Sequence, residues 1–325
     1  MGEIELVIPR YENVTIVASA RLHMGFIDLS GALGRHFGSI GVALDDINTR
    51  LTLSVARNLS ATGPCSQRAL KTTRQLCRLL DIPEALQITI GAAIPEHIGL
   101  GSGTQMALAI GMALNSFYGL GLQVRDIARI TDRGARSGIG IGVFEHGGLV
   151  LDGGRGTHTV TPPLLSQMSV PDDWRFILAF DRRGQGLHGE QEVRAFKQLP
   201  PFPRSEAERL GYLLLMQALP ALAEQDLARF GEVITELQSA VGRHFAPVQG
   251  GVFTSPEVAE AMAWLQQQGT VAIGQTSWGP TGFCAVDTPN RGNELLEQLQ
   301  EQFTSDYLSF KLVAACNQGA KIICQ

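Results

Sequence analysis

The apolar and polar positions in the first half of the chain predict short strands and a few amphipathic helices. β-Branched residues alternate with other residues over positions 13–20, a pattern typical of a strand with one buried face. Similar runs predict further strands at residues 40–44, 49–56, 86–94, 149–152 and 157–160. Apolar residues recur with the helical period over residues 67–80, 106–118 and 124–133.

The second half shows the same mixture, after a proline-rich stretch at residues 161–173. Strand-like runs lie at 176–180, 283–286 and 308–314, and helical patterns at 190–198, 210–222, 226–241, 257–268 and 292–303. Because strands and helices do not alternate regularly, the pattern favours an α+β fold over a doubly wound sheet. We therefore predict two domains, residues 1–165 and residues 166–325.

Residues 95–105 (PEHIGLGSGTQ) join a predicted strand to a predicted helix. The segment contains three glycines and two residues able to cap a helix: Gly99, Gly101, Gly103, Ser102 and Thr104. The glycines allow the backbone to turn sharply and approach a ligand, and the first N–H groups of a helix favour a phosphate. The segment predicts a phosphate-binding loop, and the alternative is a glycine-rich turn without a ligand.

Charged residues also gather at the ends of other predicted strands. One group follows the first strand and contains Arg21, His23 and Asp28. Another follows the strand at 176–180 and contains Asp181, His188 and Glu190. Glycines at every second position over residues 138–142 precede Glu145, and we favour a nearby ligand there over a tight crossing of two elements. Each group has the alternative of structural or solvated charges.

Composition narrows the classes of function. The chain has 325 residues and a net charge of −5, which argues against a nucleic-acid partner. Five cysteines without a CxxC pair are typical of reduced thiols in a cytoplasmic protein, and no cluster of zinc-ligand spacing is present. The first ten residues lack the apolar core of a signal peptide, and no apolar run is long enough to cross a membrane.

The loop at 95–104 resembles the phosphate loop of the superfamily of galactokinase, homoserine kinase, mevalonate kinase and phosphomevalonate kinase (GHMP). The glycine-rich stretch 274–282 and the region around Arg21 lie where this superfamily has its other motifs, so the resemblance covers nearly the whole chain. It implies a two-domain GHMP-kinase-like fold. The N-terminal domain would be a ribosomal-protein-like α/β domain and the C-terminal domain a ferredoxin-like α+β domain.

Three stretches, RLHMGFIDL at 21–29, GLGSGTQ at 99–105 and GQTSWGPT at 274–281, resemble the β-ribofuranosylaminobenzene 5′-phosphate synthase family within this superfamily. This resemblance implies that no phosphate is transferred from ATP. Instead, phosphoribosyl pyrophosphate condenses with 4-aminobenzoate and releases carbon dioxide and pyrophosphate, a step toward tetrahydromethanopterin. It also implies a homodimer. The residues do not decide between 4-aminobenzoate and 4-hydroxybenzoate as acceptor.

The implied chemistry assigns a role to each motif. Gly99, Gly101, Ser102, Gly103 and Thr104 would hold a phosphate or pyrophosphate, together with Mg²⁺ and without an organic cofactor. Arg21 and His23 would hold a phosphate or the benzoate carboxylate. Other expected contacts and catalytic groups are Asp28, His188, Glu190, Gln105, Thr276 and Trp278, the last stacking on the aromatic substrate. Candidate metal ligands are Asp28, Glu145 and Asp181.

The sequence is compatible with two other functions. One is an ATP-dependent small-molecule kinase of the same superfamily, and the other is a ligand-binding member without turnover. The late loop favours the synthase, because kinases usually have a run of small residues where this chain has Trp278 and Pro280.

Overall fold

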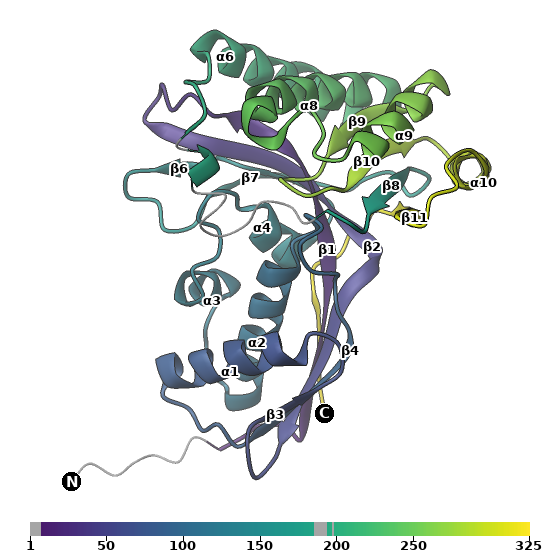
Figure 1. Cartoon of the computed structure of the whole chain (residues 1–325). Coiled ribbons are helices and arrows are strands. Elements are labelled where there is room, and N and C mark those ends of the chain that lie inside the picture. Colours follow the sequence, from purple (N-terminus) through teal and green to yellow (C-terminus); the bar gives the residue numbers. More distant parts are fainter. Residues whose placement is uncertain (1–7, 185–193, 197) are drawn as a thin grey trace.

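The computed structural model describes residues 8–184, 194–196 and 198–325. Over these residues the chain forms two halves, each with its own sheet and its own helices (Figure 1). The predicted α+β class is confirmed, since neither half shows a regular alternation of strand and helix.

Two long neighbouring strands dominate the first sheet, β1 (Asn13–Asp28) and β2 (Arg35–Val55). They pair in antiparallel fashion along their whole length, with register shifts at Ser19/Ala20 and at His23/Gly25. The order is β12–β1–β2–β4–β3, with β5 and β6 also paired to β2 and β7 paired to β5. The remaining strands are β3 (Ser60–Thr62), β4 (Leu86–Ala92), β5 (Leu149–Asp152), β6 (Arg155–Gly156), β7 (Leu164–Met168) and β12 (Lys321–Cys324).

Helix α2 (Ser102–Tyr118) lies at the centre of the first half and is buried on almost all sides. Its apolar side chains share one core with β1, β2 and β4, because Leu108 and Phe117 pack in the same cluster as Ile16 and Leu53. The helices around it are α1 (Ser66–Leu80), α3 (Val124–Ile130) and α4 (Ile139–His146). A helix that is buried on almost all sides is held in position by its neighbours, so its N-terminus is held as well.

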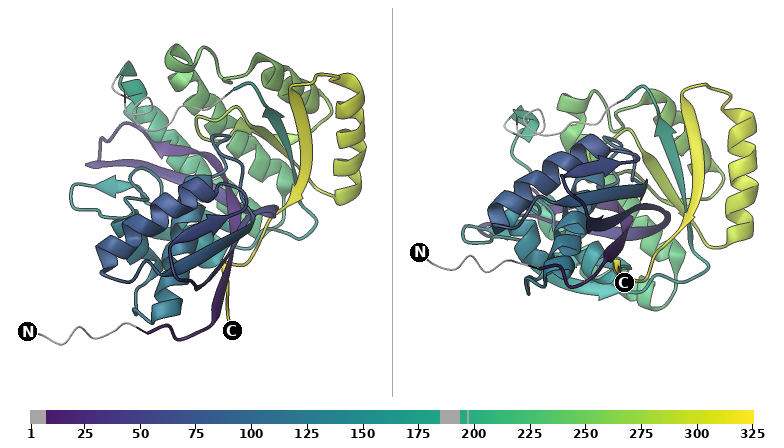
Figure 2. Two further views of the ribbon diagram at one scale, coloured as in Figure 1. Left: turned by 60° about the horizontal axis from the view of Figure 1, so that its bottom comes forward. Right: turned by 90° about the horizontal axis from the view of Figure 1, so that it is seen from below.

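The second sheet has the strand order β11–β8–β10–β9, with all neighbours antiparallel. Its strands are β8 (Arg175–Asp181), β9 (Val271–Gln275), β10 (Gly282–Val286) and β11 (Leu308–Ala314). Helices α9 (Pro256–Gln267) and α10 (Pro289–Gln302) share a core with β8 and β10. In both views of Figure 2, α10 and β11, in yellow, lie at the outer edge of this half.

Helix α8 (Leu227–Gln249) joins the two halves. Its Gln238 side chain donates to the Met24 carbonyl of β1 at 2.5 Å and accepts from the Gln275 N–H of β9 at 2.9 Å. Beside it run three consecutive helical segments, α6 (Arg204–Leu213), η1 (Leu214–Ala218) and α7 (Leu219–Ala223). No helix in the described part of the chain combines the length and apolar character that crossing a bilayer requires.

The chain does not divide cleanly at residue 165. That position lies within β7, which still pairs with β5 of the first sheet, and the second sheet begins at β8. Strand β12 then returns to the first sheet and pairs with residues 14–17 of β1. Two local predictions also differ: β1 continues to Asp28, and residues 157–160 form a turn where a strand was expected.

The glycines at 138–142 serve the packing of α4, and the expectation of a ligand beside this backbone is wrong. A Cβ on Gly142 would lie 2.6 Å from Val150 Cγ1, and one on Gly140 would lie 2.9 Å from Thr104 Cγ2. The helix therefore crosses β5 and α2 closely, which only residues without a side chain allow.

Candidate active site

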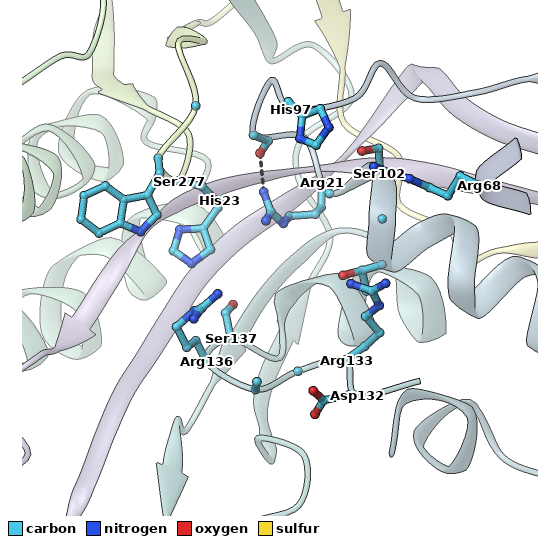
Figure 3. Close-up of a pocket in the computed structure, with 18 of the residues that line it drawn as sticks. Arg21, His23, Arg68, His97, Ser102, Asp132, Arg133, Arg136, Ser137 and Ser277 are labelled. Atoms are coloured by element: carbon cyan, nitrogen blue, oxygen red, sulfur yellow. Dashed lines mark hydrogen bonds between the residues drawn. The ribbon is translucent and has the colours of Figure 1, made fainter. Parts of the chain in front are cut away.

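A cleft of about 600 Å³ lies where β1, α1, the start of α2 and the loop after α3 meet the late loop of the second half (Figure 3). The predicted loop at 95–105 supplies one wall, and Gly99, Gly101, Ser102, Gly103 and Thr104 line the cleft. Arg21 and His23 come from β1, and Trp278 comes from the late loop. The structure thus brings most of the predicted site residues together.

Arg21 binds the backbone of the glycine loop through two hydrogen bonds. Its guanidinium donates to the Gly99 carbonyl, and its backbone N–H donates to the Leu100 carbonyl at 3.1 Å. Gly101 has φ +82°, and a Cβ there would lie 2.8 Å from Arg21 Cγ. Glycine is therefore required at this position both for the backbone angle and for the close approach of Arg21.

The late loop closes over the same backbone. The Thr276 hydroxyl donates to the Gly99 carbonyl and accepts from the His23 N–H, each at 2.9 Å. The Thr281 hydroxyl donates to the Ile98 carbonyl at 2.8 Å. Thr276, a predicted substrate contact, is fully buried and does not line the cleft. Its hydroxyl instead links β1, the glycine loop and the late loop to one another.

The N-terminus of α2 opens into the cleft. Its N-cap is Gly101, and within the described residues no side chain caps the helix, although Ser102 and Thr104 were expected to do so. The first helical hydrogen bonds use the N–H groups of Thr104 and Gln105, which leaves those of Ser102 and Gly103 outside the helical ladder. Together with the positive end of the helix dipole, these N–H groups suit an anion.

Cationic side chains surround this helix end, and the sequence patterns did not single them out. Of the residues that the structure describes, four more line the cleft in addition to Arg21: Arg68, Lys71, Arg133 and Arg136. A Cβ on Gly103 would lie 3.6 Å from Arg133 Nη1 and 3.7 Å from Arg68 Nη1, so two guanidinium groups flank this residue. Burial, and to a smaller extent the charge of Arg68, lowers the pKa of Arg133. The cleft is thus built for a multiply charged anion.

The loop that carries Arg136 and Ser137 is held by a buried carboxylate, Asp152 at the end of β5. Its oxygens accept from the Gly138 N–H at 2.8 Å and from the Ser39 hydroxyl at 2.5 Å. Burial raises the pKa of Asp152, against the hydrogen bonds, which lower it. This residue does not line the cleft and acts on the site by positioning the loop.

The other end of the cleft is aromatic. Phe26 and Trp278 line it, and the ring of His23 lies 4.7 Å from that of Phe26. Trp278 is 2% exposed and stacks on Phe245 with ring centroids 4.1 Å apart. Figure 3 shows His23, Arg136 and Ser277 at this end, with Arg68, Ser102 and Arg133 at the other and Arg21 between them.

Besides Thr276, four of the predicted residues lie away from the cleft. Gln105 is fully buried, and its amide donates to the Gly140 carbonyl at 2.8 Å, so it links α2 to α4. Asp28 accepts from the N–H and hydroxyl of Ser30 and shapes the turn after β1. Glu145 pairs with Arg125 at 3.1 Å on the outer side of α4. His188 and Glu190 lie outside the described residues.

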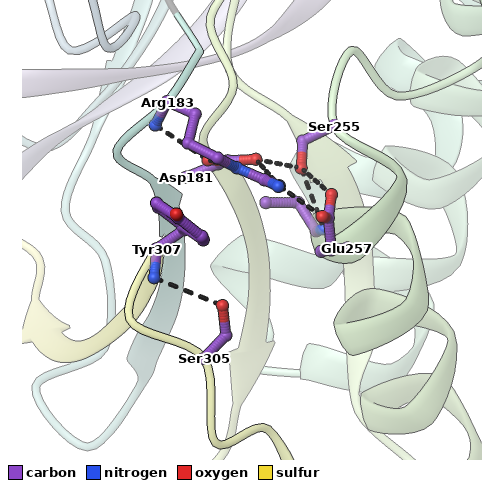
Figure 4. Close-up of polar contacts among 7 residues, drawn as sticks. Asp181, Arg183, Ser255, Glu257, Ser305 and Tyr307 are labelled. Atoms are coloured by element: carbon purple, nitrogen blue, oxygen red, sulfur yellow. Dashed lines mark hydrogen bonds and ion pairs between the residues drawn. The ribbon is translucent and has the colours of Figure 1, made fainter.

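Asp181, the fourth, belongs to a separate polar cluster in the second half (Figure 4). Its carboxylate accepts from Arg183 at 2.9 Å and from the Ser255 hydroxyl at 2.7 Å. Arg183 also pairs with Glu257 and lies over the ring of Tyr307, 4.8 Å from its centroid. The hydrogen bond from Arg183 is the main cause that lowers the pKa of Asp181 to about 2.

The three candidate metal ligands, Asp28, Glu145 and Asp181, are therefore engaged at three different places. Within the described residues no group of three or more His, Cys, Asp or Glu side chains is placed to hold a metal. Among those residues Asp132 is the carboxylate that lines the cleft. This arrangement fits a Mg²⁺ ion held mainly by substrate phosphates, which commonly needs only one or two protein carboxylates.

Comparison with known proteins identifies the family. The family models for the GHMP kinases N-terminal domain and the GHMP kinases C-terminal region match residues 67–148 and 218–305. A beta-ribofuranosylphenol 5′-phosphate synthase from Archaeoglobus fulgidus is 31% identical over 322 residues, covering 93% of this chain and 97% of that one. The chain belongs to the beta-ribofuranosylphenol 5′-phosphate synthase family of the GHMP superfamily.

A second member of this family, from Methanocaldococcus jannaschii, is 35% identical over 250 residues, which is 69% of this chain and 76% of that one. Among solved structures, a putative homoserine kinase from Listeria monocytogenes is similar with a TM-score of 0.65 and 17% identity, covering 96% of this chain and all of that one. The predicted two-domain GHMP-kinase-like fold is confirmed. Because the synthases are similar over most of the chain, they also confirm the enzyme class predicted from the sequence.

Proposed function

We propose that this member of the synthase family condenses phosphoribosyl pyrophosphate with a para-substituted benzoate and releases pyrophosphate and carbon dioxide. The observation that carries the proposal is the N-terminus of α2, flanked at Gly103 by Arg68 and Arg133. Phosphoribosyl pyrophosphate carries several negative charges, and this end of the cleft offers N–H groups and guanidinium groups to match them. The product would serve tetrahydromethanopterin biosynthesis.

The reaction makes one carbon–carbon bond and breaks two bonds. Pyrophosphate leaves C1 of the ribose with the electron pair of the C1–O bond, and the ring carbon that carries the carboxylate forms a bond to C1. The bond to the carboxylate then breaks, carbon dioxide leaves, and the electron pair restores the aromatic ring. Arg68, Arg133 and the N–H groups of Ser102 and Gly103 stabilise the charge that gathers on the departing pyrophosphate.

Arg21 would contact the substrate near the reacting carbon, because it lies between the cationic and aromatic ends of the cleft. Mg²⁺ would enter with the pyrophosphate and neutralise part of its charge, with Asp132 as the carboxylate within reach. We also keep the expectation of a homodimer as part of the proposal.

The acceptor is either 4-hydroxybenzoate or 4-aminobenzoate. The name of these relatives describes a phenol product, which is what 4-hydroxybenzoate would give by this chemistry. An amino group at the same ring position would give an aniline. Both para groups feed electrons to the reacting carbon, so reactivity alone does not separate them.

The test is an assay with phosphoribosyl pyrophosphate and each benzoate, with and without Mg²⁺. We expect pyrophosphate and carbon dioxide in equal amounts, and none of either without Mg²⁺ or without the benzoate. If neither benzoate yields pyrophosphate, the proposal fails. If the protein instead consumes ATP with a small alcohol, it is a kinase of the superfamily.

A further inference from the structure

Two ring nitrogens at the aromatic end of the cleft are buried without a hydrogen-bond partner among the described residues, His23 Nε2 and Trp278 Nε1. Both side chains line the cleft, and they are 3% and 2% exposed. Buried polar atoms in native proteins are nearly always paired, by protein, water or ligand. This pair is therefore an independent indication of a polar group that binds between aromatic rings.

The two nitrogens have opposite hydrogen-bonding capacities. The imidazole of His23 is uncharged, because burial and the neighbouring Arg21 lower its pKa to about 3. A neutral imidazole carries one N–H and one acceptor nitrogen, and with the N–H on Nδ1 the unpaired Nε2 is the acceptor. The indole Nε1 of Trp278 can only donate.

The neighbouring side chains hold both rings in place. The His23 backbone is bound by Thr276, and the His23 ring lies edge-on to Phe26. Trp278 is fixed by stacking on Phe245 and by an edge contact with Phe196, with centroids 5.4 Å apart. A donor and an acceptor fixed in this way define a small site with a preferred ligand chemistry.

We propose that His23 Nε2 and Trp278 Nε1 bind the para-hydroxyl group of the aromatic acceptor and so select 4-hydroxybenzoate over 4-aminobenzoate. This inference rests on the proposed function. The para group and the carboxylate lie at opposite ends of the ring. Binding the hydroxyl at the aromatic end therefore turns the reacting carbon toward Arg21 and the phosphate end of the cleft.

The selection follows from what each para group can offer. A phenol hydroxyl donates one hydrogen bond, here to His23 Nε2, and its oxygen lone pairs accept one from Trp278 Nε1–H. An aryl amino group has two N–H donors, and its lone pair is drawn into the ring. It would therefore leave the Trp278 donor buried and unpaired, which is costly in a desolvated site.

The experiment compares kcat/KM for the two benzoates in the wild-type protein and in Trp278→Phe. In the wild type we expect 4-hydroxybenzoate to be the better acceptor. Removal of the indole donor should lower the ratio of the two kcat/KM values by about tenfold, mostly through the hydroxybenzoate term. Trp264→Phe is the matched control, because it removes the indole of a tryptophan on α9 that does not line the cleft, and its ratio should equal that of the wild type.

A binding measurement makes the result independent of turnover and of a loss of folding. Phenol and aniline lack the carboxylate and cannot react, so calorimetry reports their affinity alone. We expect phenol to bind the wild type more tightly than aniline, and Trp278→Phe to lose this preference because the donor that aniline leaves unpaired is gone. His23→Phe should weaken the binding of both, since both donate to His23 Nε2. Equal ratios in the wild type and Trp278→Phe would overturn the inference while the synthase function stands. Absence of pyrophosphate release with both benzoates would instead overturn the proposed function.

Discussion

Gly99 and Gly279 lie with their backbones in direct contact. A Cβ on Gly279 would lie 2.8 Å from the Gly99 nitrogen, and a Cβ on Gly99 would lie 3.3 Å from Gly279 Cα. The first belongs to the loop before α2 and the second to the late loop between β9 and β10. Since one loop comes from each half of the chain, the cleft exists only when the two halves are assembled.

We predict that Gly99→Ala lowers both stability and activity. Gly99 has φ +81°, and its new Cβ would lie 2.4 Å from the Thr276 carbonyl oxygen. Gly121→Ala is the matched control. Gly121 also has a positive φ of +72°, but a Cβ there would have no described neighbour within 4 Å. The control should lose about 1 kcal/mol in the free energy of unfolding, and Gly99→Ala about 2 kcal/mol more. Equal losses in denaturant titrations would show that the two loops are not closely packed.

Arg21→Lys should impair catalysis although it keeps the positive charge. The Arg21 guanidinium donates to the Gly99 carbonyl and also lines the cleft, so it can make two contacts at once. The lysine ammonium is a compact charge without the planar, forked set of N–H donors, so it does not make both contacts in the same geometry. We expect kcat/KM for phosphoribosyl pyrophosphate to fall about ten- to hundredfold. Arg129→Lys, on the exposed side of α3, is the control and should leave kcat/KM unchanged. A wild-type value in Arg21→Lys would mean that charge alone matters at this position.

The low pKa of His23 predicts how stability changes with pH. The unfolded chain takes up a proton on this histidine below about pH 6.5, whereas the folded protein does so only near pH 3. The unfolded state therefore binds more protons between these values, and His23 lowers stability as the pH falls. His23→Gln should reduce the slope of unfolding free energy against pH by up to about 1.4 kcal/mol per unit. An unchanged slope between pH 4 and pH 6 would contradict a neutral buried imidazole.

Asp181→Asn should destabilise the second half without acting on the cleft. The carboxylate is bound by Arg183 and Ser255, and its pKa is lowered to about 2. Its contribution is therefore present above the unfolded pKa near 4 and is lost as the pH falls through 2. At pH 7 we expect a loss of about 1–3 kcal/mol, seen by thermal or denaturant unfolding. The substrate KM should not change, and a large rise in KM would place Asp181 in the active site.

The sequence predicts those parts of the site whose residues all lie within one short stretch of the chain. The loop at 95–105 combines glycines, a preceding strand and a following helix within a short window, and the structure keeps all three. The strand at 308–314 was predicted with its observed bounds for the same reason. Helix α2 begins at Ser102, four residues before the apolar pattern starts, because its first turn faces the cleft instead of the core.

What the sequence did not predict depends on contacts between distant segments. Arg68 and Lys71 lie on the polar face of α1, which reads as an ordinary solvated face until α1 is placed beside α2. Their spacing of three residues on one helix face was the available signal. Asp152 is the last residue of a short apolar strand, and nothing nearby in sequence shows that it holds the loop at Gly138. Gln105 sits next to the phosphate loop but points into the core, since one step along a helix turns a side chain by 100°.

Strand β12 pairs with residues 14–17 of β1, and the Gln325 N–H donates to the Asn13 carbonyl at 2.9 Å. During synthesis this edge of β1 therefore stays unpaired until its partner strand is made, about three hundred residues later. Pairing over such a sequence distance is slow, and an open strand edge invites pairing with other chains. The first half should consequently reach its native sheet only after the whole second half has left the ribosome. A fragment that ends near residue 165 should aggregate where the full chain folds.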